Sequence, residues 1–253
     1  MPRVSAEETP FEHIRGWRDM YRVEMNCQIV HDSIHDRAGW TREYVLSLAG
    51  TPVGYGSLAV GGPWRDKHTL YEFYVVPHHR LRMFDLFRAL LAASGAVSIE
   101  VQSNDPLATV MCHTFAGGVA SEAILFEDSQ VTSHAPAGAR FREPTASEAP
   151  EVHPEDRRYR GLIEVDGLVA ATGGILFHYN RPYGDIFMDV AEPFRRRGIG
   201  SFLVQELKRV CYENGHLPAA RCSTDNLASQ RTLQKAGLVP CGHILTGPVA
   251  VGS

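Results

Sequence analysis

The sequence has no strong excess of charge of either sign and no long apolar run. Its 253 residues carry 25 lysines and arginines against 29 aspartates and glutamates, so the formal net charge is −4. A chain without a basic surplus has no general field that attracts nucleic acid or an anionic membrane. It also lacks the roughly 20 consecutive apolar residues of a transmembrane helix. We therefore expect neither nucleic acid nor a membrane as a partner.

Cysteines are few and scattered, and no two of them form a Cys-x-x-Cys pair. The five are Cys27, Cys112, Cys211, Cys222 and Cys241. This odd, widely spaced set predicts reduced and mostly buried thiols rather than a disulfide framework. Residues 1–4 do not begin a secretory signal, so we expect a cytoplasmic location.

What the sequence does contain is a strand, a basic glycine turn and a helix in immediate succession. Residues 186–190 are rich in β-branched and aromatic side chains, as in a mostly buried strand. Pro193 should end that strand, because proline cannot donate to a ladder. Residues 195–200 have the sequence Arg-Arg-Arg-Gly-Ile-Gly, and apolar residues then recur at helical spacing from Phe202 to Val210.

Two glycines just before a helix let the backbone take positive φ and approach a ligand closely. The free amides and the dipole of the helix start form a site for phosphate oxygens, and the arginines add positive charge. The turn is not a P-loop, because no Gly-Lys-Ser/Thr follows, and it lacks the third glycine of a dinucleotide fingerprint. These residues alone leave two alternatives, a phosphate site and a solvated basic loop.

The turn resembles the (Gln/Arg)-x-x-Gly-x-(Gly/Ala) signature of the GNAT superfamily of acyl-CoA-dependent N-acyltransferases. Residues 226–238 resemble a second GNAT segment, Asn-x-x-Ala/Ser followed by Tyr and Lys-x-Gly-Phe. Two such blocks in the right order are far more specific than either alone. The resemblance covers residues 156–247 well and the first half weakly.

The two halves repeat the same order of elements. Residues 75–84 align with residues 191–200, and Asp105 falls opposite Asn226. In this alignment Arg82 and Phe84 replace the two glycines, and their side chains would crowd a pyrophosphate off the amides. The first half therefore resembles a degenerate GNAT copy.

We thus predict an α/β (α+β) fold of two tandem GNAT-like mixed β-sheet domains flanked by helices. The degenerate domain would span residues 1–134 and the acetyl-CoA-binding domain residues 135–253. Periodicity and turn residues predict helices over 10–34, 84–95, 105–115, 198–215 and 226–236. They predict strands over 43–49, 53–60, 70–76, 97–102, 122–126, 160–165, 168–177, 185–191, 219–223 and 241–245, and they allow a short strand over 139–143. Residues 1–9 are expected to be frayed. Asp105 is the predicted N-cap of the helix over 105–115, and Asp166-Gly167 is the predicted turn of a hairpin.

The GNAT resemblance implies acetyl-CoA as co-substrate, with its pyrophosphate on the turn and its pantetheine along the preceding strand. A backbone amide near Val190 or Ala191 would polarise the thioester carbonyl. Asn226 is in addition a good helix N-cap. The cofactor-binding residues implied are Val190, Ala191, Arg195, Arg196, Arg197, Gly198, Ile199, Gly200, Ser201, Asn226 and Ser229.

An amine acceptor must be neutral to attack, so a general base is expected. Asp189 is the first candidate, because it is nearest to the implied thioester, and Glu192 at the strand end is the second. Asp185, Glu164 and His178 are further candidates. A surface carboxylate or a structural hydrogen bond is the alternative for each of them.

The general acid departs from the family pattern. The position of the usual GNAT tyrosine is Leu233, which cannot protonate a departing thiolate. Tyr179, Tyr183 or Cys222 could act instead, the thiolate could leave unprotonated, or catalysis could be weak.

His31 and His35 in the first half are four residues apart and could hold a metal on a helix, or take part in an acceptor site. No third ligand is indicated, so a solvated helix end is favoured and we predict no metal.

Two functions follow. The first is an acetyl-CoA-dependent N-acetyltransferase that acts on the amine of a small molecule, as a monomer or homodimer. The second is a CoA- or acyl-CoA-binding sensor or scaffold without transfer activity, which Leu233 suggests. A phosphate-ligand binder unrelated to CoA is a weaker third.

Overall fold

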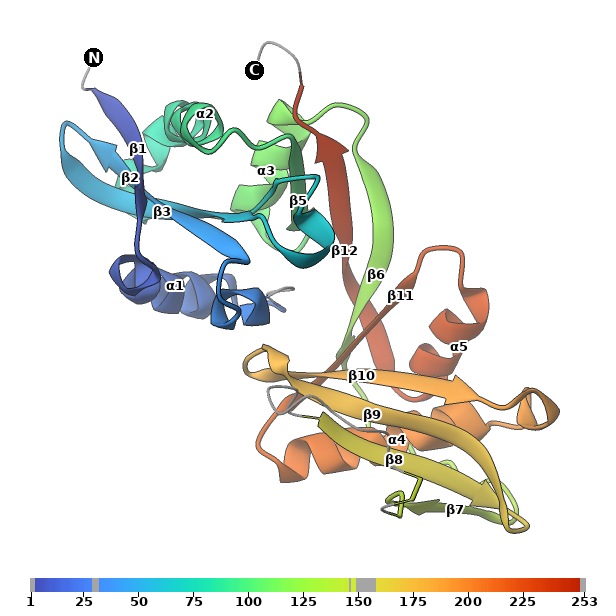
Figure 1. The fold of residues 1–253 in the computed structure, drawn as a ribbon. Coiled ribbons are helices and arrows are strands. Elements are labelled where there is room, and N and C mark those ends of the chain that lie inside the picture. The colour runs from blue at the N-terminus through green and yellow to red at the C-terminus, as the bar shows by residue number, and fades with distance from the viewer. Residues whose placement is uncertain (1–2, 29–31, 146, 149–157, 251–253) are drawn as a thin grey trace. The chain divides into compact units, whose positions relative to one another are not determined.

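The computed structural model describes residues 3–28, 32–145, 147–148 and 158–250, and the chain forms two compact units (Figure 1). Unit 1 comprises Met1–Cys27, Ser33–Glu122 and His243–Ser253. Unit 2 comprises Gln28–Asp32 and Ala123–Gly242. No helix in the described residues is long and apolar enough to cross a membrane.

The sheet of unit 1 has the strand order β1-β2-β3-β4-β5-β12. Strands β1 to β4 pair antiparallel, β4 and β5 pair parallel, and β12 returns antiparallel to β5. The strands are β1 (Val4–Thr9), β2 (Thr41–Leu48), β3 (Thr51–Ala59), β4 (Thr69–Val75), β5 (Ser98–Gln102) and β12 (Leu238–Pro248).

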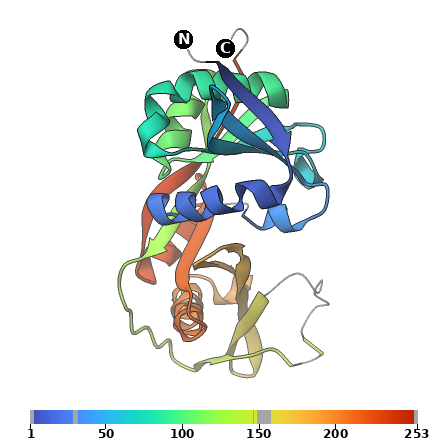
Figure 2. The ribbon, with the colours of Figure 1, turned by 90° about the vertical axis from the view of Figure 1, so that its left-hand side faces the viewer.

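Helices α1 and α2 lie on opposite sides of strands β1 to β4, as both views show (Figures 1 and 2). Asp105 caps α3 by accepting a hydrogen bond from the amide of Ala108 at 3.0 Å, which confirms the predicted cap. The helices are α1 (Phe11–Met25), α2 (Met83–Ser94) and α3 (Pro106–Phe115), with short 3₁₀ turns η1 (Asp32–Asp36), η2 (Gly62–Trp64) and η3 (Pro77–Arg82).

Two predictions for the N-terminal segment are wrong. The predicted helix over 10–34 ends at Met25, because Asn26 adopts a left-handed conformation with φ of 43° and its amide closes the helix on Arg22 O. Residues 4–9, predicted to be frayed, form edge strand β1, in which Val4 lies opposite Leu48. Two glutamates and a threonine hide the strand alternation of this segment in the sequence.

The sheet of unit 2 runs from β6 through β11, β10, β9 and β8 to β7. Helix α4 packs on it with the buried side chains of Leu203 and Leu207, and the predicted Asp166-Gly167 hairpin is confirmed by positive φ at both residues. The elements are β6 (Ala120–Asp128), β7 (Ala139–Arg142), β8 (Arg158–Val165), β9 (Leu168–Asn180), β10 (Tyr183–Val190), η4 (Glu192–Phe194), α4 (Ile199–Glu213), β11 (Leu217–Ser223) and α5 (Leu227–Lys235).

Strands β10 and β11 separate part-way along their length (Figure 1). They pair in parallel only from Tyr183 opposite Leu217 to Ile186 opposite Ala220. Beyond Ile186, β10 continues to Val190 with its other edge paired to β9. Among the described residues, no strand pairs with the β11-facing edge of residues 187–190.

The compact units are not the two contiguous halves of the chain. Residues 123–134 group with unit 2, and the last part of β12 pairs with β5 in unit 1, from Ile244 opposite Gln102 to Pro248 opposite Ser98. Apart from the short segment Gln28–Asp32, which groups with unit 2, the units therefore divide after Glu122 and again after Gly242. The sequence predicted one boundary, after residue 134.

The cysteine prediction is confirmed in its main point. All five cysteines are free thiols, and Cys112, Cys211 and Cys222 are buried.

Candidate functional site

A groove of about 880 Å³ opens in unit 2 where the end of β10, the start of α4 and one face of α5 meet. The predicted site residues that line it are Asp189, Val190, Arg195, Arg196, Gly198, Ile199, Gly200, Ser201, Asn226 and Ser229. Ala191, Glu192 and Arg197 were predicted with them but are not among its lining residues.

The turn before α4 has the backbone of an anion site. Arg196 and Gly198 adopt left-handed conformations with φ of 62° and 79°. Left-handed residues in a tight turn aim successive amides toward one point, and α4 adds the positive end of its dipole. Gly200 lies against Thr232 and Val190, since a Cβ placed on it would be 3.0 Å and 3.1 Å from their methyl carbons.

The three arginines of the turn have different positions. Arg195 donates from Nε to the carbonyl oxygen of Val190 at 3.0 Å and so fixes the turn to the strand end. Arg196 lines the groove. The guanidinium of Arg197 instead lies over the ring of Phe194, 5.6 Å from its centroid. Of the three arginines of the turn, only Arg195 and Arg196 therefore bring charge to the groove.

Of the two backbone amides predicted to contact the thioester, one is already used in a hydrogen bond of the sheet. The Ala191 amide donates to Ala170 O on β9 at 3.0 Å. Because hydrogen-bonding direction alternates along an antiparallel strand, the Val190 amide points to the opposite edge, where β11 has separated. The assignment to Ala191 is therefore corrected, and Val190 is the candidate donor.

Helix α5 closes the groove. Asn226 caps it by accepting from the Ser229 amide at 3.0 Å, which confirms the predicted cap. Leu233 is 2% exposed and belongs to the core, so its side chain fills a packing position.

Neither of the two alternative acids whose side chains the structure describes, Cys222 and Tyr183, lines the groove. Burial raises the pKa of the Cys222 thiol, although the Ser229 hydroxyl opposes that shift. Cys222 and Tyr183 are buried and do not line the groove. The side chains of Tyr179 and of the candidate base His178 lie outside the described part of the chain.

The remaining candidate bases differ in their surroundings. Asp189 is exposed and lines the groove. Asp185 is buried and ion-paired with Arg221 at 3.2 Å, and Glu164 is ion-paired with Arg142 at 2.9 Å. Glu192 is exposed beyond the strand end. Geometry therefore favours Asp189.

Two cations in the groove, Arg231 and Lys235, were not predicted. They are one turn apart on α5, so they share a face of that helix. The sequence signal that could have identified them is their i, i+4 spacing on the helix that follows Asn226.

Unit 1 repeats the framework of this turn without its anion site. Arg80 donates from Nε to Val75 O at 2.9 Å, as Arg195 does to Val190. No residue from 77 to 85 has positive φ. The first turn of α2 instead carries Asp85, which pairs with Arg82 at 2.8 Å.

These bonds correct the predicted alignment by one residue. The amide of His79 donates to Val76 O and that of Phe194 to Ala191 O, so Val76 corresponds to Ala191. The alignment had matched Pro77 with Pro193, but proline fits two successive positions of this turn. Met83 and Asp85, rather than Arg82 and Phe84, therefore stand where unit 2 has its glycines.

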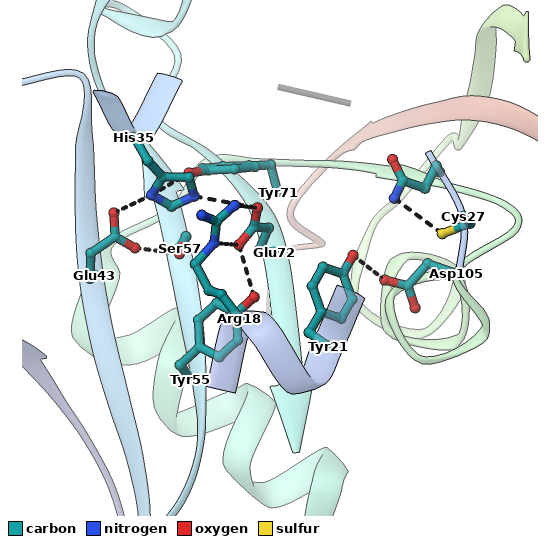
Figure 3. A network of polar contacts seen from close by, with 11 residues as sticks. Arg18, Tyr21, Cys27, His35, Glu43, Tyr55, Ser57, Tyr71, Glu72 and Asp105 are labelled. Atoms are coloured by element: carbon teal, nitrogen blue, oxygen red, sulfur yellow. Dashed lines mark hydrogen bonds and ion pairs between the residues drawn. The ribbon is translucent and has the colours of Figure 1, made fainter. Parts of the chain in front are cut away.

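The largest charge cluster described in unit 1 surrounds His35 (Figure 3). Arg18 binds Glu72 through Nε at 2.9 Å and Nη2 at 2.8 Å. His35 lies 2.9 Å from Glu43 and 3.3 Å from Glu72. Tyr55, Tyr71 and Ser57 complete the cluster: Tyr55 donates to Glu72, Ser57 to Glu43, and the Tyr71 hydroxyl contacts the His35 ring.

The electrostatics of this cluster are balanced. Burial alone would lower the pKa of His35, but the Glu72 and Glu43 carboxylates outweigh it and raise that pKa above its ordinary value. Burial alone would raise the pKa of Glu72, but Arg18 and His35 hold it well below its usual range. Arg18 and the His35 ring thus face the side chains of Glu43 and Glu72.

The His35 side chain is 1% exposed and both ring nitrogens are engaged. The prediction of a solvated helix end is therefore wrong for this residue. His31 lies outside the described residues. Among the described residues, no group of three His, Cys, Asp or Glu side chains is arranged to hold a metal ion.

Comparison with known proteins agrees with this geometry. Residues 126–238 match the sequence profile of the acetyltransferase (GNAT) family. Residues 126–238, most of unit 2, thus form a domain of the GNAT family. No curated protein sequence matches it.

Solved structures show that the GNAT likeness covers both units. An acetyltransferase of the GNAT family from Colwellia psychrerythraea is 14% identical, with 97% of this chain and all of that one aligned at a TM-score of 0.73. A tandem GNAT protein from the clavulanic acid biosynthesis pathway, solved without acetyl-CoA, is 14% identical, with 99% of this chain and all of that one aligned at 0.65. A GCN5-related N-acetyltransferase from Sphaerobacter thermophilus is 13% identical and covers 99% of this chain, with 97% of its own length aligned at 0.60. The tandem GNAT fold is thus confirmed.

Proposed function

We propose that this GNAT protein transfers an acetyl group from acetyl-CoA to the amine of a small molecule, with acetyl-CoA as co-substrate. One observation carries the proposal. The left-handed turn at Arg196 and Gly198 and the open edge of β10 border the same groove. The first suits a diphosphate and the second suits an extended pantetheine arm, which can pair with a strand edge through its amides.

The chemistry follows from these positions. With the pyrophosphate on the turn, the thioester lies near the end of β10, where the Val190 amide points into the groove. A hydrogen bond from that amide stabilises the negative charge that develops on the thioester oxygen. Asp189 is placed to accept the proton of the attacking amine, directly or through water.

The departing thiolate has no evident protein acid. Leu233 is in the core, and no tyrosine is among the described residues that line the groove. A thiolate is a fair leaving group because the thiol pKa is about 8.5, so it can leave unprotonated or take a proton from water.

The absence of an evident acid for the thiolate among the described residues of the groove favours a second candidate function. Without an acid the unit could bind CoA or acyl-CoA as a sensor or scaffold. Acetyl-CoA titration combined with an assay of free thiol release over an amine panel separates the two. Amine-dependent thiol release supports the transferase, whereas tight binding with no release for any amine supports the sensor.

For the partners we propose a small-molecule amine acceptor, and a monomeric or homodimeric protein in the cytoplasm. The free thiols of all five cysteines fit that compartment.

A further inference from the structure

We propose that Arg231 and Lys235 of α5 bind the 3′-phosphate of CoA and make the groove select CoA over dephospho-CoA. This inference rests on the proposed acetyl-CoA site. It adds a contact to the 3′-phosphate, the group that CoA carries and dephospho-CoA lacks.

Two cations of α5 add positive charge to the groove beside the anion turn. They lie four residues apart on one face of α5, and both side chains line the groove. Neither pairs with a carboxylate among the described residues. A Cβ placed on Gly198 would be 3.6 Å from Lys235 Nζ, so this ammonium lies next to the anion turn.

The turn can hold a diphosphate without these cations. It supplies its own amides, the α4 dipole and the side chains of Arg195 and Arg196. Arg231 and Lys235 come from a different helix and are exposed at the groove. Two further cations beside a turn that already offers donors for a diphosphate indicate a ligand with a second anionic group.

CoA carries such a group in its 3′-phosphate. A phosphate monoester has a second pKa near 6 and is therefore close to doubly charged at pH 7.5. Its three oxygens can accept from a guanidinium fork and an ammonium at once. Dephospho-CoA has the same diphosphate and pantetheine but lacks this group.

The test is a calorimetric titration of CoA and dephospho-CoA into the full-length protein and into Arg231→Gln, Lys235→Gln and the double variant. We expect the unaltered protein to bind CoA about tenfold more tightly, since two exposed charge pairs contribute roughly 1.4 kcal/mol together. In the double variant both ligands should bind with the Kd of dephospho-CoA to the unaltered protein. The preference should also shrink as salt rises from 50 to 500 mM.

Arg209→Gln is the matched control, because it removes an exposed positive charge of α4 that pairs with Glu206 and Glu213 outside the groove. It should keep the full preference. Equal affinity of the unaltered protein for both ligands would overturn the inference, as would an equal loss for both ligands in the double variant. If neither ligand binds, the CoA site itself is refuted, and the two failures are thereby distinguished.

Discussion

Arg195 Nε donates to the carbonyl oxygen of Val190 at 3.0 Å and so ties the basic turn to the end of β10. The bond uses a carbonyl on the open edge of the strand, since β11 has already separated there. The same bond joins Arg80 and Val75 in unit 1, where the turn has no left-handed residue. The arginine therefore shapes the turn in both units, and the positive φ values distinguish the anion site.

This pair of bonds gives a matched test. Arg195→Gln should weaken acetyl-CoA binding about fivefold, because a net hydrogen bond of roughly 1 kcal/mol that positions the turn is lost. Arg80→Gln should leave binding unchanged. Isothermal titration should also give one acetyl-CoA per chain for the unaltered protein; two per chain would contradict the view that unit 1 is degenerate.

Gly198→Glu should reduce acetyl-CoA affinity by at least about tenfold. The new carboxylate would extend toward Lys235 and repel phosphate oxygens at the turn. Positive φ would also cost roughly 1–2 kcal/mol of stability. Gly167→Glu is the control, since Gly167 has φ of 78° in a hairpin turn with open space around it. We expect both variants to lose a similar amount of Tm, but only Gly198→Glu to lose acetyl-CoA binding. If acetyl-CoA binding weakened equally in both variants, backbone strain alone would explain the loss.

Asp189→Asn should lower kcat about 100-fold or more with an accepted amine, because the loss of a general base has this size. The KM for acetyl-CoA should change little, since the groove keeps its cations. Glu192→Gln should retain near-full activity because Glu192 lies outside the groove. Steady-state assays of thiol release decide this, and the reverse ranking of the two variants would assign the base to Glu192.

The cluster around His35 should make unit 1 most stable in mildly acidic solution. The folded pKa of His35 is raised, so its contribution is complete below its ordinary value of about 6.5 and is lost as pH rises through the folded pKa. The folded pKa of Glu72 is lowered, so its contribution is complete above the ordinary value of about 4.5 and is lost progressively as pH falls from there through the folded pKa.

Urea unfolding between pH 5 and 9 measures this dependence. His35→Gln should be less stable at pH 6 and should lose the decline above neutral pH that the unaltered protein shows. His113→Gln removes an exposed histidine of α3 and should keep that decline. A decline that persists in His35→Gln would show that another group titrates.

The sequence predicted what local chemistry determines. The glycines and arginines of residues 195–200 and the caps at Asn226 and Asp105 act through neighbours only a few residues away, so their structure follows from spacing. The element order followed from hydrophobic periodicity for the same reason. Among the elements, the C-terminal end of α1 and the edge strand β1 were predicted wrongly.

What could not be predicted depends on partners distant in sequence. His35 contacts Glu72, which is 37 residues away in the sequence, and the Ala191 amide donates to the Ala170 carbonyl oxygen. Arg231 and Lys235 became candidates only when α5 was seen to line the groove. The one-residue error in the repeat arose because a proline was used as an anchor where backbone hydrogen bonds set the register.

The pairing of β12 with β5 has a consequence for how the protein is made. A ribosome completes β5 well before Ile244–Pro248, so for on the order of 10 s, at about 5–20 residues per second, the nascent N-terminal unit carries an uncovered strand edge. Expression of the first half alone would leave that edge open permanently and invite self-association. Strand β12 thus completes the sheet of unit 1.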